Sequence, residues 1–186
     1  MNRSGRYGAS RGAILDAAEE LIRTKGVAGT SISDIVHASG TSAGAIYHHF
    51  ASKQDIVLAV SLRAVAEPVA IALAETGPMS PAELFALAAE RAVAEPTTSA
   101  MLVQIWAGAA ADATLRDLLA THGAGFHAGV AAHIAEWCAT HGLDASQVAQ
   151  TVVGAVIGLV VQASVFGDFD RRGYVDQVRE LLERLG

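Results

Sequence analysis

The sequence predicts an all-α protein of about nine helices. Of its 186 residues 52% are hydrophobic but only 5% are aromatic, and alanine is abundant, which favours packed helices over sheets. All four prolines lie between Pro68 and Pro96, so long stretches on either side are open to uninterrupted helices. No alternation of apolar and polar residues bounded by turns predicts a strand. With 17% charged residues, the composition also excludes a disordered chain.

Start and stop signals divide the first part of the chain into four helices. Gly26 and Gly40 are typical of residues that follow a helix end, while Ser31 and Ser52 each begin a capping-box pattern. Pro68 is expected to kink the last helix of the four. The four helices are predicted at 11–25, 32–39, 42–50 and 53–75.

Five more helices are predicted in the second part. Ser80, Pro81 and Glu83 combine a cap, a first-turn proline and a box glutamate, which opens a helix that ends before Pro96. Asp144 is placed to cap a later one. The remaining helices are expected at 98–109, 112–140 (which Gly123, Gly125 and Gly129 are able to break), 145–166 and 174–185.

Three features of the sequence indicate the cellular compartment of the protein. The first 12 residues lack the apolar run of a signal peptide, and a single cysteine, Cys138, excludes an intrachain disulfide framework and a Cys₄ zinc site. The segment 145–167 holds no charge, but its fully apolar run Val152–Val161 is shorter than the roughly 20 residues of a membrane span. We therefore expect a cytoplasmic protein in which this segment is a buried helix.

Two short predicted helices, 32–39 and 42–50, flank a tight turn at Gly40, which is typical of the DNA-binding helix-turn-helix. Ile35 and Ile46 are expected to face the core. The outer face then presents hydroxyls and longer donors suited to phosphate oxygens. A plain three-helix corner with solvated polar residues has the same spacing. The candidate outer residues are Ser33, Thr41, Ser42, Ala43, Gly44, Ala45, Tyr47, His48 and Lys53.

The charge is unevenly distributed. The formal net charge is −6, yet residues 1–60 carry six basic and five acidic residues. The acidity therefore lies in the later part of the chain, and a basic arm precedes the first helix. This asymmetry permits a nucleic-acid face near the N-terminus.

Three segments carry a resemblance to a known family: Gly12–Ile22, Gly26–Val36 and Ser39–Asp55. In order and spacing they closely resemble the N-terminal domain of tetracycline-repressor (TetR) family regulators, over about residues 11–60. The most specific part is Gly44-Ala-Ile-Tyr-His-His-Phe50 followed by Ser52-Lys53. The resemblance implies a homodimer whose third helices enter successive major grooves of a palindromic operator. It also implies a C-terminal domain that binds a small inducer, which weakens DNA binding.

The resemblance also implies roles for individual residues. It implies that Tyr47 and Lys53 contact phosphates, and that His48 and His49 are additional candidates for such contacts. Backbone contacts fall to Ser31 and Ser33, at the start of the supporting helix. The base-facing turn is Ala43, Gly44 and Ala45.

The sequence departs from the family pattern at several of these positions. Ala43 stands where proline or a long polar residue is frequent, and Thr41 stands where valine is frequent. Val36 and Ser39 replace the usual alanines. Because the recognition helix lacks Arg, Gln and Asn, bidentate base readout is weak, and specificity is expected to rest on methyl contacts, backbone donors and DNA shape. The arm residues Arg3, Arg6 and Arg11 are open to two interpretations, DNA contact or a solvated tail.

The C-terminal part is predicted to hold a dimer interface and an effector pocket. Helix 145–166 is apolar nearly all round, which requires burial on several sides, and with 174–185 from each subunit it would form a four-helix interface. The interface candidates are Val153, Gly154, Ile157, Gly158, Val161, Val178 and Leu182. An apolar or amphipathic effector would meet an aromatic-lined pocket, although such residues also fit a plain core. The pocket candidates are Phe85, Met101, Trp106, Phe126, His127, His133 and Trp137.

Taken together, the sequence predicts a ligand-responsive DNA-binding transcriptional regulator, most simply a repressor. Residues 1–55 are expected to form the arm and DNA-binding domain, and residues 56–186 the ligand-binding and dimerisation domain. No enzyme activity, metal or cofactor is expected, since the histidines lack metal-ligand spacing and Ser42 in its Gly-x-Ser-x-Gly pattern follows a predicted helix rather than a strand. An α-helical enzyme and a membrane-associated helical protein stay as alternatives.

Overall fold

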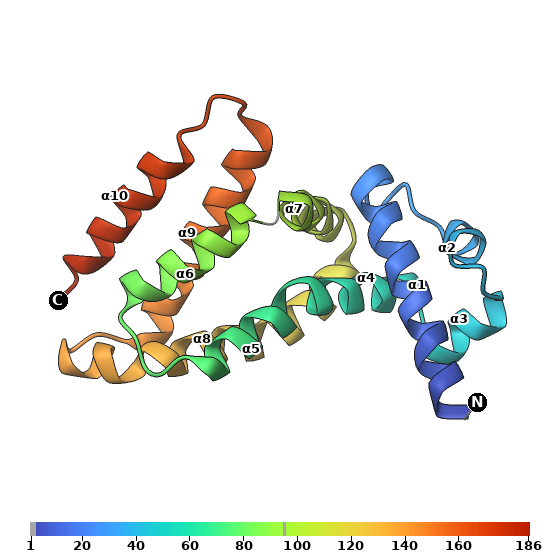
Figure 1. Cartoon of the computed structure of the whole chain (residues 1–186), viewed down its shortest axis with the longest axis horizontal. Helices are drawn as coiled ribbons and strands as arrows, with labels where there is room; N and C mark the ends of the chain where they lie inside the picture. The colour runs from blue at the N-terminus through green and yellow to red at the C-terminus, as the bar shows by residue number, and fades with distance from the viewer. Residues whose placement is uncertain (1–2, 95) are drawn as a thin grey trace. The chain divides into compact units, whose positions relative to one another are not determined.

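A computed structural model describes residues 3–94 and 96–186, with side chains for residues 10–94 and 98–186. Every regular element in these ranges is a helix, which confirms the predicted all-α class (Figure 1). Since α4 and α5 are joined into one continuous helix, the described residues form nine helical rods. The elements are α1 (Arg3–Lys25), α2 (Ile32–Ser39), α3 (Ala43–His49), α4 (Lys53–Ser61), a π turn (Leu62–Ala66), α5 (Glu67–Glu75), α6 (Pro81–Ala94), α7 (Pro96–Ala111), α8 (Ala113–Thr140), α9 (Ala145–Val165) and α10 (Arg171–Glu183).

The chain forms two compact units. The N-terminal unit is Met1–Val65 with Gln104–Ala120, and the C-terminal unit is Ala66–Val103 with Thr121–Gly186. These units differ from the expected division at residue 55, because a later segment completes the first one. The Gln54 amide donates to the Asp112 carboxylate at 2.7 Å, and a Cβ added at Gly108 would lie only 2.8 Å from Val27 Cβ.

Capping places the first helices as the sequence predicts. Ser31 Oγ accepts from the Asp34 N–H at 3.1 Å, while the Asp34 carboxylate accepts from the Ser31 N–H at 2.9 Å. Bonds from the Ser31 hydroxyl and N–H, and then from Lys25, lower the pKa of Asp34 to about 2. Gly26 and Gly40 end α1 and α2 at φ +72° and +65°, in the left-handed region that glycine enters without steric cost.

Helix α1 is longer than predicted, since it begins at Arg3 rather than near residue 11. The sequence has glycines but no proline before residue 12, and an established helix extends one hydrogen bond at a time without a new nucleus. The arm therefore continues α1. The side chains of Arg3 and Arg6 lie outside the described residues, whereas the Arg11 guanidinium lies over the Phe50 ring, 5.4 Å from its centroid.

Pro68 shapes the junction of α4 and α5. Proline has no N–H, and its ring clashes with the carbonyl four residues earlier. The helix takes a π turn at Leu62–Ala66, just before this residue. The predicted kink is thus absorbed by a wider turn, and the chain passes from one unit to the other between Val65 and Ala66. Arg63 in this turn forms ion pairs with Asp16 (2.7 Å) and Glu19 (2.6 Å) of α1.

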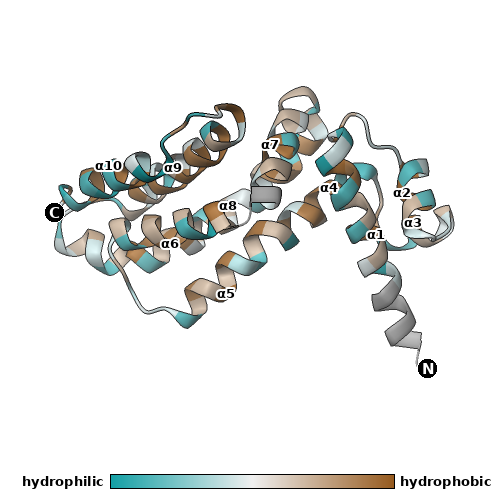
Figure 2. Cartoon of the chain, turned by 45° about the horizontal axis from the view of Figure 1, so that its top comes forward, coloured by the Kyte–Doolittle hydropathy of each residue, from teal (hydrophilic) through white to brown (hydrophobic). Residues whose placement is uncertain are grey.

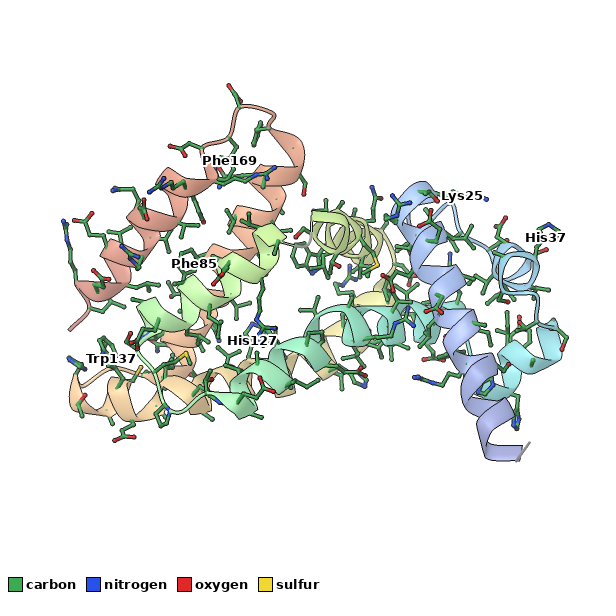
Figure 3. All side chains as sticks on the ribbon, in the orientation of Figure 1. Lys25, His37, Phe85, His127, Trp137 and Phe169 are labelled. Carbon is green, nitrogen blue, oxygen red and sulfur yellow. The ribbon has the colours of Figure 1, made fainter. Side chains whose placement is uncertain are left out.

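In the C-terminal unit, α6 packs against both α9 and α10. Phe85 of α6 is fully buried in this core and is labelled in Figure 3. Helix α8 runs unbroken past its three glycines, because Val130, Ile134 and Cys138 anchor its later turns in the core. Its glycines each cost about 0.5–1 kcal/mol relative to alanine.

Two helices are long and apolar enough to cross a membrane by length and composition, namely Lys53–Glu75 and Ala145–Val165. Figure 2 shows the hydrophobic colour along much of α9, in contrast to the hydrophilic α10. The whole of helix α9 is thus long and apolar enough to span a membrane, although its fully apolar run is too short. Core helices of soluble proteins are often as long and as apolar. Helix α9 contributes Val148, Val152 and Leu159 to the core.

Candidate functional site

The turn between α2 and α3 presents a face made mostly of small residues. Gly40 makes the turn, and the Ser39 and Thr41 hydroxyls are hydrogen-bonded at 2.8 Å. Ser42 caps α3 by accepting from the Ala45 N–H at 3.1 Å. Ser42, Ala43 and Gly44 are exposed, while Thr41 and Ala45 are half-buried. This is the surface that the sequence predicts to face DNA bases.

The longer side chains of α3 divide between the surface and the core. Tyr47 is 59% exposed and His48 is also exposed, whereas Ile46 and Phe50 are buried. Their positions agree with the predicted outer and inner faces of a recognition helix. Contact with DNA stays a prediction for each of them.

Two other predicted contacts already bond or pack within the N-terminal unit. The Lys53 ammonium donates to the Val27 carbonyl at 3.0 Å, so two of its three donors are left over for a phosphate. His49 is half-buried, and its Nδ1 is out of reach of solvent. Burial, followed by the nearby His48 and Arg11, lowers the pKa of His49. A neutral, half-buried His49 is poorly suited to a phosphate contact.

Helix α2 contributes a surface that the sequence reasoning left incomplete. Ser33 and His37 are both exposed and lie one turn apart, next to the half-buried Asp34. His37 was not predicted, although its position four residues after Ser33 was the available signal. Lys25 and His37 are labelled in Figure 3. Ser31 is exposed, but its hydroxyl and N–H are engaged by Asp34.

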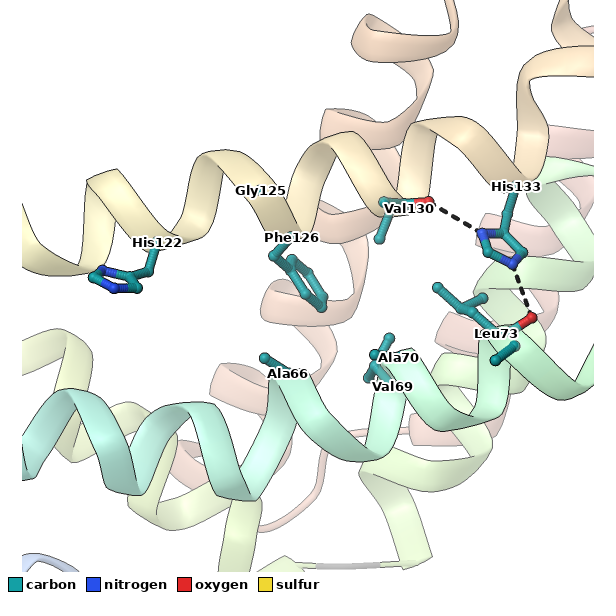
Figure 4. Close-up of a pocket in the computed structure, with 11 residues that line it drawn as sticks. Ala66, Val69, Ala70, Leu73, His122, Gly125, Phe126, Val130 and His133 are labelled. Carbon is teal, nitrogen blue, oxygen red and sulfur yellow. Dashed lines mark hydrogen bonds between the residues drawn. The ribbon is translucent and has the colours of Figure 1, made fainter.

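The C-terminal unit holds a groove between α5 and α8, which we call the α5/α8 groove (Figure 4). Its volume is about 310 Å³, at the lower end of the range for small-molecule sites. Most of its lining is aliphatic or glycine. It is lined by Ala66, Val69, Ala70, Leu73, Ala74, His122, Gly125, Phe126, Gly129, Val130 and His133.

His133 bridges the two walls of the groove. Its Nε2 lies 2.8 Å from the Leu73 carbonyl oxygen on α5, and its Nδ1 lies 3.1 Å from the Gly129 carbonyl oxygen on its own helix (Figure 4). The His133 carbonyl also accepts from the Met79 N–H at 3.1 Å, in the connection that follows α5. One residue therefore holds the end of α5 and the next loop against α8.

The groove takes up only two of the seven predicted pocket residues, Phe126 and His133. Phe85 and Met101 are buried, and Trp106 belongs to the N-terminal unit. His127 approaches the Gly123 carbonyl at 2.8 Å, and Trp137 stacks on His141 with centroids 4.0 Å apart. The α5 wall was missed altogether. The available signal on α8 was the stripe at helical spacing formed by His122, Gly125, Phe126, Gly129 and His133.

The predicted interface residues are divided between the surface and the protomer's own core. Leu182 is only 4% exposed, and a Cβ at Gly158 would lie 2.8 Å from the Tyr174 hydroxyl, so both serve packing within the protomer. Gly154 and Ile157 are exposed on α9, and Val153, Val161 and Val178 are half-buried. The exposed leucines near the C-terminus are Leu181 on α10 and Leu185 just after it, neither of which was predicted.

Two family models match the chain. The model for bacterial regulatory proteins of the tetR family matches residues 14–60, and the model for the C-terminal domain of BetI-type transcriptional repressors matches residues 81–186, more than half of the chain. The chain belongs to the TetR family. Within this TetR-family transcriptional regulator, the first match covers α2, the turn and α3, and the second covers α6 to α10.

Curated relatives match a short stretch of the chain. The transcriptional repressor KstR2 of Mycobacterium tuberculosis is 35% identical over 54 residues, which are 29% of this chain and 27% of KstR2. The regulator TtgR of Pseudomonas putida is 41% identical over 51 residues, 27% of this chain and 24% of TtgR. These matches span about a quarter of the relatives' length.

Solved structures match nearly the whole chain. A TetR-family regulator from Rhodococcus sp. gives a TM-score of 0.76 at 22% identity, over 93% of this chain and 98% of its own. FadR of Bacillus subtilis, solved with stearoyl-CoA, gives 0.72 at 20%, over 91% and 96%. A regulator from Saccharomonospora viridis, solved with choline, gives 0.62 at 25%, over 94% and 93%. The first two likenesses establish the fold.

Two features bear on enzyme activity. In the part of the chain that the structure describes, no three His, Cys, Asp or Glu residues are grouped so that they could hold a metal ion. Ser42 stands between two helices, whereas a nucleophile elbow needs a strand before the serine. The members of this family are transcriptional regulators.

Proposed function

We propose that this TetR-family chain is a ligand-responsive repressor, which binds a palindromic operator as a homodimer and is released by a small apolar or amphipathic effector. The observation that carries the proposal is the helix-turn-helix with an exposed α3 in a chain matched at both ends by family models for regulators. The printed names of relatives as repressors and the FadR complex with stearoyl-CoA support it. The proposal includes a cytoplasmic location and no catalytic activity.

DNA recognition falls to the exposed part of the α2–α3 surface. Tyr47 and His48 supply donors for phosphates, and the small residues Ala43 and Gly44 let the backbone approach base edges closely. Because no Arg, Gln or Asn lies on α3, the operator is read mainly by methyl contacts and by shape. Lys53 adds a phosphate contact only through the donors that Val27 leaves.

Dimerisation falls to the outward faces of α9 and α10. Gly154, Ile157 and Val161 lie at helical spacing on α9. Leu181 is exposed on α10, and Leu185 is exposed just after it. Exposed apolar residues grouped on two helices are typical of a protein–protein interface. A self-complementary interface with two-fold symmetry would pair two recognition helices, as a palindromic operator requires.

Effector binding in the α5/α8 groove would reach α3 through the covalent chain. Helix α5 continues through the π turn into α4. Only three residues separate the end of α3 at His49 from the start of α4 at Lys53. Half-sites lie about 34–36 Å apart, so a small change in the separation of the two α3 helices loses the register. An effector needs a differential free energy of about 1–3 kcal/mol between the two states.

Fluorescence anisotropy with labelled DNA from immediately upstream of the protein's own gene tests the proposal. We expect tight binding that falls steeply with salt and that weakens in Tyr47→Ala. Tyr47→Phe keeps the ring and removes the phosphate donor, so an intermediate loss is expected. Arg91→Ala removes an exposed positive charge on α6 and serves as the control for a general charge effect.

Two results of that titration would contradict the proposal or limit it. Equal affinity for random DNA together with indifference to Tyr47→Ala would remove α3 as the reading helix. A genome-wide selection of bound fragments then distinguishes a distant operator from no operator, since an operator appears as an enriched palindrome. Recovery of no enriched sequence would refute the repressor and return the enzyme alternative.

The membrane-associated alternative rests on the two apolar helices, Lys53–Glu75 and Ala145–Val165. Detergent phase partition of the purified chain tests it directly. We expect the chain in the aqueous phase, because α9 is turned partly into the core and its exposed face is covered by the second subunit. Recovery in the detergent phase would favour the membrane reading.

A further inference from the structure

The α5/α8 groove is long and slender. On α5 its lining runs from Ala66 to Ala74, and on α8 from His122 to His133, which at 1.5 Å per residue corresponds to about 12 to 16 Å along the helices. A volume of about 310 Å³ spread over that length leaves a mean cross-section of about 19 to 26 Å². Such a cross-section accepts one extended hydrocarbon chain.

Small residues keep the groove open. The α5 wall has alanine at positions 66, 70 and 74, and the α8 wall has glycine at 125 and 129. A Cβ added at Gly125 or Gly129 would meet no atom within 4 Å. Glycine in a helix interior is unfavourable, and neither glycine is required by close packing. Both therefore keep space free in the groove.

The chemistry of the lining disfavours a cation. Among the described residues that line the groove there is no Asp or Glu, and Phe126 is the only benzene-type ring. A quaternary ammonium group is held by carboxylates or by several aromatic faces within about 6 Å. An unpaired charge in such a groove is costly.

We propose that the α5/α8 groove binds an unbranched alkyl chain with an uncharged polar head, and that it rejects quaternary ammonium ligands. This inference rests on the proposed function, because it takes the groove to be the effector site. The alkyl chain lies along Ala70, Phe126 and Val130, and the polar head lies toward a histidine end. The ligand class is set by the absence of a carboxylate and by the two glycines.

The test uses isothermal titration calorimetry on the full-length protein without DNA. The probes are 1-decanol and decyltrimethylammonium, which share one alkyl chain and differ in head group, with choline as the head alone. Decanol is expected to bind at least roughly tenfold more tightly than decyltrimethylammonium, and choline is expected to give no heat. Equal or tighter binding of decyltrimethylammonium, or no binding of decanol, would overturn the proposal.

Two matched variants locate the binding. Gly129→Leu fills the groove, whereas Gly123→Leu adds the same side chain to the same helix outside the lining, also with no atom within 4 Å of the new Cβ. Leucine is a better helix former than glycine, so both are expected to fold, and circular dichroism checks this. Decanol binding is expected to be lost in Gly129→Leu alone. Unchanged binding in Gly129→Leu would place the ligand elsewhere.

A separate measurement keeps this inference apart from the proposed function. Decanol is added to the preformed complex with DNA, and release is followed by anisotropy. Binding in the groove without release would refute the groove as the effector site, while the ligand chemistry would stand. Release of DNA by choline alone, with no effect of decanol, would refute the ligand chemistry, while the ligand-responsive repressor would stand.

Discussion

The two candidate sites of this protein differ in how far apart their residues lie in the chain. The α2–α3 surface comes from one continuous segment of about twenty residues, whose caps and turn are all local. The α5/α8 groove joins segments that begin at Ala66 and at His122. A local site can be recognised in the sequence, because the spacing of its residues along the chain determines how they are arranged in space. For a groove between helices that are distant in the chain, the sequence of each helix shows only the residues of one wall and does not indicate which helix forms the other.

The two sites also differ in what fills them. The α2–α3 surface rests on a fully buried set formed by Ile14, Ile22, Ile35 and Ile46. The groove is defined by atoms that are missing, at glycine and alanine positions. Large side chains predicted to line a pocket, such as Phe85 and Met101, are instead buried in the protein interior. In this chain the glycine and alanine positions indicate the groove better than the large side chains do.

The largest expected effect separates the two units by their cores. Ile46→Ala and Ile134→Ala each remove a fully buried isoleucine, so each is expected to destabilise its own unit by about 2–5 kcal/mol. Because the two residues belong to different compact units, Ile46→Ala is expected to lower amide protection mainly in α1–α4, and Ile134→Ala mainly in α6, the later part of α8, α9 and α10. Hydrogen exchange read by mass spectrometry measures both. Equal loss throughout the chain in both variants would mean one cooperative unit.

The next effect concerns the outward face of α9. Ile157 is 37% exposed, and a charge there would be buried in the proposed dimer. Ile157→Glu is therefore expected to give monomers and to weaken operator binding by roughly 10²-fold or more, because the two half-sites are no longer linked. Sedimentation velocity and anisotropy measure the two results. As a contrast, Gly158→Ala presses on Tyr174 inside the protomer and is expected to lower stability rather than association; an intact Ile157→Glu dimer would move the interface elsewhere.

The extent of sequence prediction follows the same contrast. Caps at Ser31, Ser52 and Asp144 were predicted because each is a local hydrogen bond within a few residues, and the structure confirms them. The engagement of Lys53 by Val27 was not, because the two residues are 26 positions apart. The same holds for the Gln54–Asp112 bond, which ties a later segment into the N-terminal unit. Nothing in the local pattern of either residue points to the other.

A smaller effect is expected at the π turn, where the chain first passes from one unit to the other. Pro68→Ala restores the missing N–H, so the helix can return to regular α geometry over Leu62–Ala66. Stability is expected to rise by less than about 1 kcal/mol, whereas effector-driven DNA release is expected to require several-fold more effector, because a straight helix no longer bends at the turn. Thermal unfolding and effector titrations of the DNA complex measure these. An unchanged release curve would mean that the turn takes no part in coupling.

The smallest effect is the pH dependence at the start of α2. The Ser31 hydroxyl and N–H, then Lys25, bond to the Asp34 carboxylate and lower its pKa from 3.8 to about 2. A depressed pKa in the folded state stabilises the protein above the unfolded value, near pH 4, and that contribution is lost as the pH falls toward 2. Asp34→Asn keeps the shape of the cap but removes this titration, so its stability is expected to be closer to the wild type at pH 2 than at pH 5. Because Asp34 is solvated, the difference is small, and chemical denaturation at the two pH values measures it. A gap that stays the same at both would mean that the carboxylate charge does not hold the cap, and that the hydrogen-bonding shape of Ser31 with residue 34 is sufficient to open the helix.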